Sequence, residues 1–228
     1  MSTILPLRPD NQSSIAAQIH RRLREDIVRG ALAPGQALSE SEISTRYGIS
    51  RQPVREAFIR LANDSLVSIQ PQRGTFVVRI SVKEVMDARF VREAVEVAVV
   101  REAARVASGL AVDALRELVE CQRQVEVGDN DAFLALDEAF HQELAHAAGR
   151  RSAWQAVDRI KAQMDRVRYL SYEAATPVER LIAQHERIVD AIAARNPDAA
   201  EAGMRAHLEE ILESLPEIAR QYPEVFER

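Results

Sequence analysis

A helical pattern that runs from residue 81 to residue 215, with no strand pattern inside it, constrains the fold more than any other feature. Apolar residues recur there at steps of three and four, the spacing of one face of an α-helix. Glycine and proline divide the run, and the helices predicted between them cover residues 81–107, 111–128, 130–148, 150–171, 177–195 and 197–215. The pattern predicts an antiparallel all-α helical bundle of six helices, or seven if residues 216–228 add a short helix rather than a loose tail.

The residues before 80 follow a different pattern, with three short helices. Apolar residues recur at four-residue steps over residues 14–29, which predicts the first helix. Ser39 and Glu42 form the S-x-x-E pattern of a capping box, which opens a second helix. A third helix is predicted over residues 51–62, with Ser50 as its capping residue.

Two strand-like runs follow the third helix. The sequences LVSIQ (66–70) and TFVVR (75–79) read as short strands, and PQRG between them is a hairpin turn. Helix, helix, turn, helix and hairpin in this order make a winged helix-turn-helix. The protein is therefore predicted to be mainly α, with a winged helix-turn-helix domain at residues 1–79 and an all-helical domain at residues 80–228.

Composition indicates an ordered protein with a basic N-terminal third. Hydrophobic residues make up 46% and charged residues 29% of the 228 residues, which argues against a disordered chain. The net charge is -5, yet residues 1–80 carry 11 arginines against seven acidic side chains, as expected if this part meets a polyanion. The single Cys121 cannot form an internal disulfide, the N-terminal residues lack a secretory signal pattern, and no apolar run is long enough to span a membrane. We therefore expect a cytoplasmic protein without a membrane partner.

The third predicted helix carries side chains suited to DNA. Arg51 and Arg55 lie one turn apart beside its apolar stripe, and Gln52 projects further round. The helix N-terminus favours phosphate, and an arginine fork can bind guanine O6 and N7 in the major groove. The spacing alone also fits solvated residues on an amphipathic helix. Arg73 favours the DNA interpretation, because an arginine beside Gly74 at a wing tip can approach a DNA backbone or minor groove closely.

A resemblance to the DNA-binding domain of GntR-family bacterial transcription regulators covers residues 38–77, LSESEISTRYGISRQPVREAFIRLANDSLVSIQPQRGTFV. The family's S-R-x-P-V-R-E-A motif stands at 50–57 and its R-G-x-x-V wing at 73–77. The resemblance implies contacts with double-stranded DNA through Ser50, Arg51, Gln52, Pro53, Arg55, Arg73 and Gly74. Ser41 stands where the family often has a DNA-contacting arginine, which implies one contact fewer.

Three helices of the predicted bundle carry metal-ligand residues on their apolar faces. Asp137 and His141 stand four residues apart on one such face. His185 interrupts a second face, and His207 a third. An ionised carboxylate or an unpaired imidazole in an apolar face is costly, so each needs a partner. A single divalent cation would serve all four, and these ligands suit zinc, nickel, cobalt or manganese, with positions left for water or a ligand.

Each of these histidines, considered singly, is more often a hydrogen-bonded core residue than a metal ligand. The four positions together favour a metal, because the chain has five histidines and three of them fall on these faces. His146 provides a contrast. It follows His141 by five residues, so it points about 140° away round the helix and is not expected to bind the metal.

A second resemblance, to the FCD effector-binding domain of FadR-type regulators, covers residues 81–215. It rests on the D-x-x-x-H pair at 137–141 and on the segments QHERIVDAI (184–192) and MRAHL (204–208). The resemblance implies a metal at the floor of an effector cavity, held by Asp137, His141, His185 and His207. Six predicted helices rather than seven indicate the VanR-like subgroup.

Arg92 and Arg89 are the candidate effector-binding residues. Arg92 lies on the seam formed with Val85 and Val99, so its guanidinium is expected inside the bundle. There it either pairs with Glu96 one turn later or binds a carboxylate of the effector. One carboxylate and three neutral imidazoles around a divalent ion leave a net positive charge, which suits a small organic acid.

The sequence therefore favours a DNA-binding transcription regulator and not an enzyme. We expect a homodimer that places two recognition helices in successive major grooves of a pseudopalindromic operator, controlled by a small carboxylate effector beside a divalent metal, zinc first among those named. Two alternatives stay open. The metal could be purely structural, or the protein could be a metal-dependent hydrolase, for which the sequence offers no convincing general base beside the four ligands.

Overall fold

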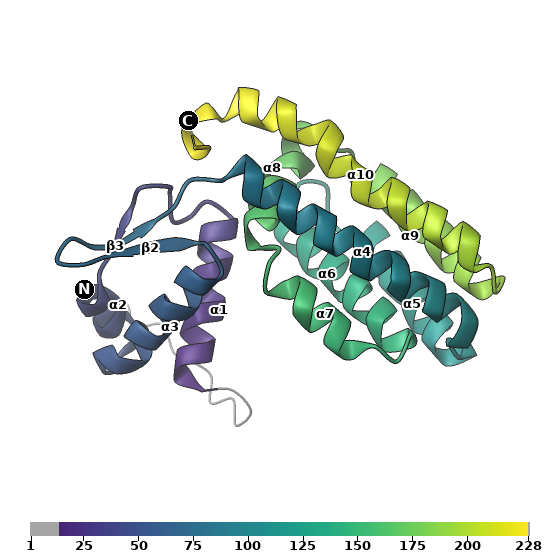
Figure 1. The fold of residues 1–228 in the computed structure, drawn as a ribbon, viewed down its shortest axis with the longest axis horizontal. Coiled ribbons are helices and arrows are strands. Elements are labelled where there is room, and N and C mark those ends of the chain that lie inside the picture. Colours follow the sequence, from purple (N-terminus) through teal and green to yellow (C-terminus); the bar gives the residue numbers. More distant parts are fainter. Residues whose placement is uncertain (1–13, 228) are drawn as a thin grey trace. The chain divides into compact units, whose positions relative to one another are not determined.

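The computed structural model describes residues 14–227, which form two compact units (Figure 1). The first unit contains the residues up to Ser81 together with those from Glu224 onward, and the second runs from Val82 to Pro223. Ten α-helices and one three-stranded sheet make up nearly all of the regular structure of the described residues. The mainly helical fold class predicted from the sequence is confirmed.

The first unit is a winged helix-turn-helix. Its helices are α1 (Ile15–Val28), α2 (Glu40–Tyr47) and α3 (Arg51–Asn63), and its strands are β1 (Ala37–Leu38), β2 (Val67–Gln70) and β3 (Gly74–Val77). Strand β3 lies between β1 and β2 and is antiparallel to both, with Phe76 paired to Ala37 on one side and to Ser68 on the other. Strand β1 was not predicted, because two residues are too few to show an alternating pattern.

Local chemistry sets the ends of these helices. The Ser39 hydroxyl accepts a hydrogen bond from the Glu42 amide at 3.3 Å, as the capping box predicts. Gly48 ends α2 with a φ of 66°, in the left-handed region that favours glycine. Ser50 occupies the N-cap position of α3, but its side chain makes no capping hydrogen bond to the described backbone. The predicted N-cap position of Ser50 is therefore confirmed, but the side-chain hydrogen bond expected of a capping serine is not formed.

The second unit is an all-helical bundle. Its helices are α4 (Val82–Val106), α5 (Gly109–Arg123), α6 (Asn130–Ala147), α7 (Arg151–Asp158), α8 (Ala162–Ala174), α9 (Val178–Ala193) and α10 (Pro197–Gln221). Helices α4 and α10 run side by side in opposite directions (Figure 1). Buried side chains from all seven of these helices form the core, among them Val100, Leu115, Phe140, Ile188 and Met204. No helix within residues 14–227 is long and apolar enough to cross a membrane.

The helix predicted over residues 150–171 is in fact two helices, α7 and α8. The chain turns at residues 159–161, where the amides of Ile160 and Lys161 both bond to the Val157 carbonyl. Lys161 is 2% exposed, and its ammonium lies 2.5 Å from Glu138 and 2.7 Å from Asp165. These ion pairs hold the Lys161 side chain in the interior at the turn between α7 and α8. The described part of the bundle thus has seven helices, which removes the basis for the VanR-like subgroup.

The last helix, α10, also extends beyond its predicted end at residue 215. It continues through Pro216 to Gln221 because buried Leu215 and Ile218 keep it packed on the bundle, although a proline removes one helical hydrogen bond. The chain then returns to the first unit. The Ile80 amide donates to the Val225 carbonyl at 2.8 Å, next to a parallel bridge between Ile80 and Phe226. The C-terminal residues up to 227 are therefore neither a separate α-helix nor a loose tail.

Candidate metal centre and DNA interface

The four metal-ligand residues predicted from the sequence come together inside the helical unit. Asp137 and His141 lie one turn apart on α6, and His185 and His207 come from α9 and α10. One potential ligand atom of each lies within 4.8 Å of the others, and all four residues are at most 6% exposed. His146 lies outside this group, at the surface, with Nδ1 3.2 Å from Glu143.

The outer nitrogen of each clustered imidazole faces an oxygen. His185 Nδ1 lies 2.8 Å from Gln122 Oε1, and His207 Nδ1 lies 3.1 Å from Gln184 Oε1. His141 Nδ1 contacts the carboxylate of Glu96. A neutral imidazole carries its proton on one nitrogen only, so Nδ1–H donors here leave Nε2 lone pairs on the inner side.

The inner atoms are acceptors that face one another. His141 Nε2 lies 3.2 Å from His207 Nε2, and His185 Nε2 lies 3.5 Å from Asp137 Oδ1. Within residues 14–227, neither His185 Nε2 nor Asp137 Oδ1 has a hydrogen-bond donor. Because buried acceptors without partners are costly, a cation among these atoms would stabilise the arrangement.

Burial keeps the imidazoles neutral. It lowers the pKa of His141, and it lowers the pKa of His185 and His207 well below the ordinary value, with neighbouring histidines and arginines adding to the effect. Burial alone would raise the pKa of Glu96, but Arg92 and His141 outweigh it and hold that pKa at about 2. The cluster therefore presents neutral ligands held in place by a charged carboxylate.

The donor set fits a divalent transition metal. Ligands about 2.0 to 2.2 Å from a zinc ion lie up to about 4 Å apart, so the cluster needs only small adjustments to enclose one. Nitrogen and carboxylate ligands together suit zinc and its neighbours in the first transition row. A bound ion would act as a Lewis acid, with coordination positions left for an oxygen ligand.

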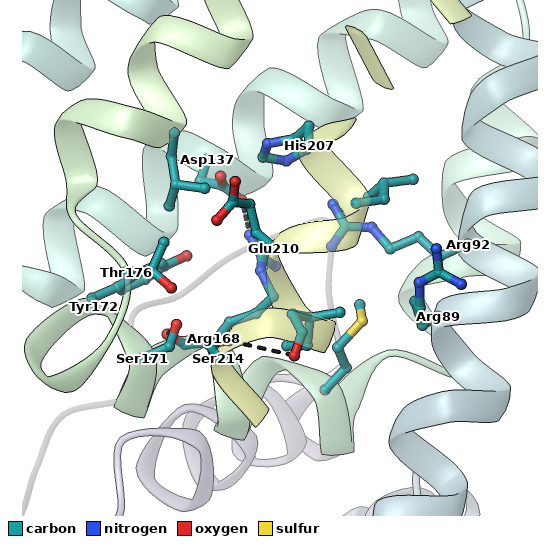
Figure 2. A pocket seen from close by; sticks show the side chains of 14 residues that line it. Arg89, Arg92, Asp137, Arg168, Ser171, Tyr172, Thr176, His207, Glu210 and Ser214 are labelled. Carbon is teal, nitrogen blue, oxygen red and sulfur yellow. Dashed lines mark hydrogen bonds and ion pairs between the residues drawn. The ribbon is translucent and has the colours of Figure 1, made fainter. Parts of the chain in front are cut away.

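A cavity of about 30 Å³ adjoins the cluster, room for one or two water molecules. Figure 2 shows Asp137 and His207 at one end of it, Arg89 and Arg92 on one side, and the hydroxyl-bearing Tyr172 on the opposite side. Apolar side chains complete the wall, among them Met164, Leu181, Leu208 and Ile211. The wall thus combines cationic, hydroxyl and apolar groups next to the four ligands.

Arg92 makes the pair with Glu96 that the sequence offered as one alternative, and it also borders the cavity. Its Nε donates to Glu96 Oε1, while its Nη2, buried at the cavity, has no hydrogen-bond partner among the described residues. Arg89 also lines the cavity, and its Nη2 lies 2.6 Å from Glu93. Both arginines predicted to bind an effector therefore border the cavity, and each has one buried donor, Arg92 Nη2 and Arg89 Nε, without a hydrogen-bond partner among the described residues.

Helix α8 contributes cavity residues that the sequence did not assign, Arg168 and Tyr172 among them. Arg168 is 8% exposed, donates to Asp137 Oδ2, and also bonds Glu138 at 2.9 Å. Because Arg168 bonds only Oδ2, the other carboxylate oxygen of Asp137, Oδ1, faces His185. Tyr172 lines the cavity with a buried hydroxyl, and the neighbouring Arg168 guanidinium opposes the rise that burial causes in the pKa of that hydroxyl.

The residues predicted to contact DNA lie at the start of α3 and at the hairpin. Six of the seven are exposed and one is partly buried, namely Ser50, Arg51, Gln52, Arg55, Arg73, Gly74 and, partly buried, Pro53. Arg55 donates two hydrogen bonds to Glu40, at 3.0 and 3.1 Å. Arg51 Nη2 donates to Ser41 Oγ at 3.1 Å, so Ser41 orients one of the predicted contacts. The start of α2 thus holds both arginines at the surface.

A winged helix-turn-helix joined to a helical unit with an internal cavity defines the class of DNA-binding transcription regulators. The chain belongs to the GntR family of bacterial regulatory proteins: the sequence profile of that family matches residues 15–77, and the profile of the FCD domain matches residues 87–210. These families consist of regulators, so the protein is a transcription regulator rather than an enzyme.

Named relatives agree with this assignment. The HTH-type transcriptional repressor RspR of Escherichia coli K12 is 43% identical over 222 residues, which cover 97% of this chain and 95% of RspR. An HTH-type transcriptional regulator of Streptomyces ambofaciens is 36% identical over 208 residues, or 91% of this chain and 88% of that protein.

Solved structures show the same fold. Escherichia coli McbR/YncC superposes with a TM-score of 0.77 at 22% identity, covering 92% of this chain and all of that one. A GntR regulator of Rhodococcus sp. RHA1 gives a TM-score of 0.71 at 27% identity, covering 90% of this chain and 99% of that one.

Proposed function

We propose that this regulator binds a small carboxylate beside a divalent metal in its helical domain, and that this binding changes its affinity for a pseudopalindromic operator. In this proposal residues 1–79 bind DNA and residues 80–228 bind metal and effector. The metal is zinc first, with nickel, cobalt or manganese as substitutes, on Asp137, His141, His185 and His207. The working form is a cytoplasmic homodimer, because one recognition helix per subunit reads one half-site.

The observation that carries the proposal is that buried hydrogen-bond acceptors without partners lie in the metal-ligand cluster, whereas buried donors without partners belong to residues that line the cavity. The acceptors without donors, Asp137 Oδ1 and His185 Nε2, belong to the four-residue cluster, where a cation would satisfy them. The donors without acceptors, Arg92 Nη2 and Arg89 Nε, belong to two residues that line the cavity, where a carboxylate could accept from them. The Tyr172 hydroxyl can serve either partner. A metal and an acid side by side match this division of charge.

The size of the cavity gives a reason for switching. The cavity has room for only a few water molecules, so an acid of more than a few non-hydrogen atoms can bind only if the lining side chains or helices move. Helix α4, which carries Arg89 and Arg92, begins at the residue after the end of the first unit. Movement of α4 would thus act directly on the chain leading into the DNA-binding domain. A coupling of roughly 1 to 3 kcal/mol would change operator affinity about 5- to 150-fold.

The sense of regulation is proposed from the relative that is 43% identical, which is named a repressor. We expect this chain also to repress, and the acid to release it from the operator. The proposal leaves Ser50, Arg51, Gln52, Pro53, Arg55, Arg73 and Gly74 as the DNA-contacting set.

Calorimetry tests the proposal. A panel of small organic acids is titrated into the metal-loaded and the chelator-treated protein, and the acids that bind are added to band-shift assays on the operator. We expect binding that requires the metal, that is weakened by Arg92→Ala and not by Arg105→Ala at an exposed position of the same helix, and that changes operator affinity.

Two results would contradict the proposal. Acids that bind equally well without metal would refute binding of the carboxylate at the metal. An unchanged effector response after complete metal removal would show that the metal is only structural, which is the alternative that the sequence left open.

A further inference from the structure

We infer that Gln122 and Gln184 are positioning residues that decide which nitrogen of two histidines faces the metal. The inference rests on the proposed metal site and adds to it the groups that prepare its ligands. Neither glutamine can reach the metal as a ligand without giving up its histidine. Each acts through the imidazole whose outer nitrogen it contacts.

Gln122 lies near the end of α5 and is 1% exposed. Its Nε2 donates to the backbone carbonyl of Leu136 at 3.2 Å, and its Oε1 lies 2.8 Å from His185 Nδ1. If the amide were reversed, its oxygen would face the Leu136 carbonyl oxygen and both acceptors would lose a donor. The backbone of α6 therefore fixes the amide so that its oxygen points at His185.

Gln184 is fixed by a carboxylate instead of a carbonyl. Its Nε2 donates to Glu210 Oε1 at 2.5 Å, and its Oε1 lies 3.1 Å from His207 Nδ1. Glu210 is 7% exposed and also pairs with Arg180, whose Nε lies 2.8 Å away. Reversal of this amide would place an oxygen against a carboxylate. The oxygen of Gln184 is thus directed at His207.

Both glutamines accept from Nδ1–H, so the Nε2 atoms of both histidines carry lone pairs toward the cluster. The imidazoles are already in the tautomer that binds a metal through Nε2. Without the acceptors each ring could carry its proton on Nε2, and metal binding would first have to move that proton. Loss of such an outer partner typically lowers metal affinity about 10- to 100-fold.

The choice of amides rather than carboxylates also has a consequence for the effector. A carboxylate in place of each glutamine would fix the same tautomers, but it would add two negative charges beside the metal. Neutral amides leave the metal-loaded cluster with a net positive charge. They therefore prepare the ligands without weakening the attraction for an acid.

The experiment compares three changes around Gln184 in the full-length protein. Gln184→Met removes the acceptor at nearly constant length. Gln184→Glu keeps an acceptor but sets a carboxylate against Glu210. The double variant Gln184→Glu with Glu210→Gln restores both hydrogen bonds and the total charge. Gln163→Met serves as the control, because Gln163 is a buried glutamine on α8 whose side-chain oxygen accepts from Arg166 at 3.3 Å.

Two measurements are made on each protein. Nitrogen-15 NMR of the ring nitrogens in chelator-treated protein reports the tautomer directly, without any metal. Competition with a chromophoric chelator gives the affinity for Zn²⁺ and Co²⁺. We expect Nδ1-protonated His185 and His207 in the wild type, and loss of that state at His207 alone in Gln184→Met. Its metal affinity should fall about 10- to 100-fold, and the double variant should recover it.

Gln122→Met should have the same effects at His185, which keeps the inference testable if Gln184→Met fails to fold. Wild-type NMR with Nε2-protonated His185 and His207 would overturn the inference, as would an affinity unchanged in both methionine variants. The expected tautomers together with no affinity for either metal would instead overturn the proposed metal site. The NMR result is obtained without metal, so the two failures are distinguishable.

Discussion

Glu96→Gln should destabilise the helical domain strongly, although it alters few atoms. Glu96 is 4% exposed and pairs with Arg92, which is 2% exposed. The pKa of Glu96 lies at about 2 instead of 4.5, a lowering of about 2.5 pH units. At about 1.4 kcal/mol per unit the surroundings favour the charged form by roughly 3 kcal/mol. We expect a loss of about 3 to 5 kcal/mol in unfolding free energy, because buried Arg92 would lose its direct ion-pair partner.

The matched control lies on the same helix at the same spacing. Lys83 and Asp87 also form an i to i+4 pair, at 2.6 Å, but their side chains are 84% and 65% exposed. Water screens this pair, so Asp87→Asn should leave the unfolding free energy unchanged within error. The comparison separates burial from pairing, since both pairs join a basic residue to an acidic residue one turn later.

The assay is urea unfolding of the chelator-treated full-length protein, followed by the helical circular dichroism signal. The folded-state pKa of Glu96 is below its unfolded value, so its contribution is complete above about pH 4.5 and is lost as the pH falls toward 2. The difference between wild type and Glu96→Gln should therefore shrink from pH 7 to pH 3. Equal effects of Glu96→Gln and Asp87→Asn at pH 7 would refute the reasoning.

Three further predictions concern the two sites. Arg55→Ala should weaken operator binding by roughly 1 to 3 kcal/mol per half-site. Arg60 is exposed near the other end of α3, so Arg60→Ala should have less effect. Equal band-shift affinities of wild type and Arg55→Ala at fixed salt would contradict this prediction. His185→Ala should lower metal content and thermal stability together, and His146→Ala neither, because a metal shared by three helices stabilises only the folded state; elemental analysis decides. Chelator-treated protein should lose unfolding free energy below about pH 6.5, by up to about 4 kcal/mol per pH unit. The three clustered histidines have lowered pKa values in the folded protein, so they take up protons mainly when it unfolds. A urea midpoint that stays constant from pH 7 to pH 5.5 would argue against this prediction.

The metal-ligand cluster could be predicted because each ligand lies on an uninterrupted helix. Helical phase then places a residue on the buried face from its spacing alone, as for Asp137 and His141 on α6. The same signal was present for Gln122, which continues the buried series Val112, Leu115 and Val119 on α5. A glutamine on an apolar helix face, like a histidine there, predicts a buried hydrogen-bond partner.

Arg168 and Tyr172 could not be placed in this way. Residues 150–171 were predicted as one helix, but the turn at residues 159–161 resets the helical phase between α7 and α8. At this turn Lys161 pairs with Asp165 and with Glu138, which is distant in sequence. Charged residues are usually exposed to solvent, so the charged residues of α8 hid from the sequence pattern that this helix is buried.

The charges around the cluster explain why a cation and an acid would depend on each other. The ion-pair network that contains Asp137, Arg168, Lys161 and the Arg92–Glu96 pair beside His141 has four acids and three bases, namely Glu96, Asp137, Glu138, Asp165, Arg92, Lys161 and Arg168. Glu210 and Arg89, which also line the cavity, are paired with Arg180 and Glu93 and add no net charge. With neutral histidines the formal charge of the network is one negative unit, which attracts a divalent ion and disfavours an acid. The ion turns this into one positive unit, which a single carboxylate neutralises. Because linkage is reciprocal, the factor by which metal raises acid affinity must equal the factor by which acid raises metal affinity.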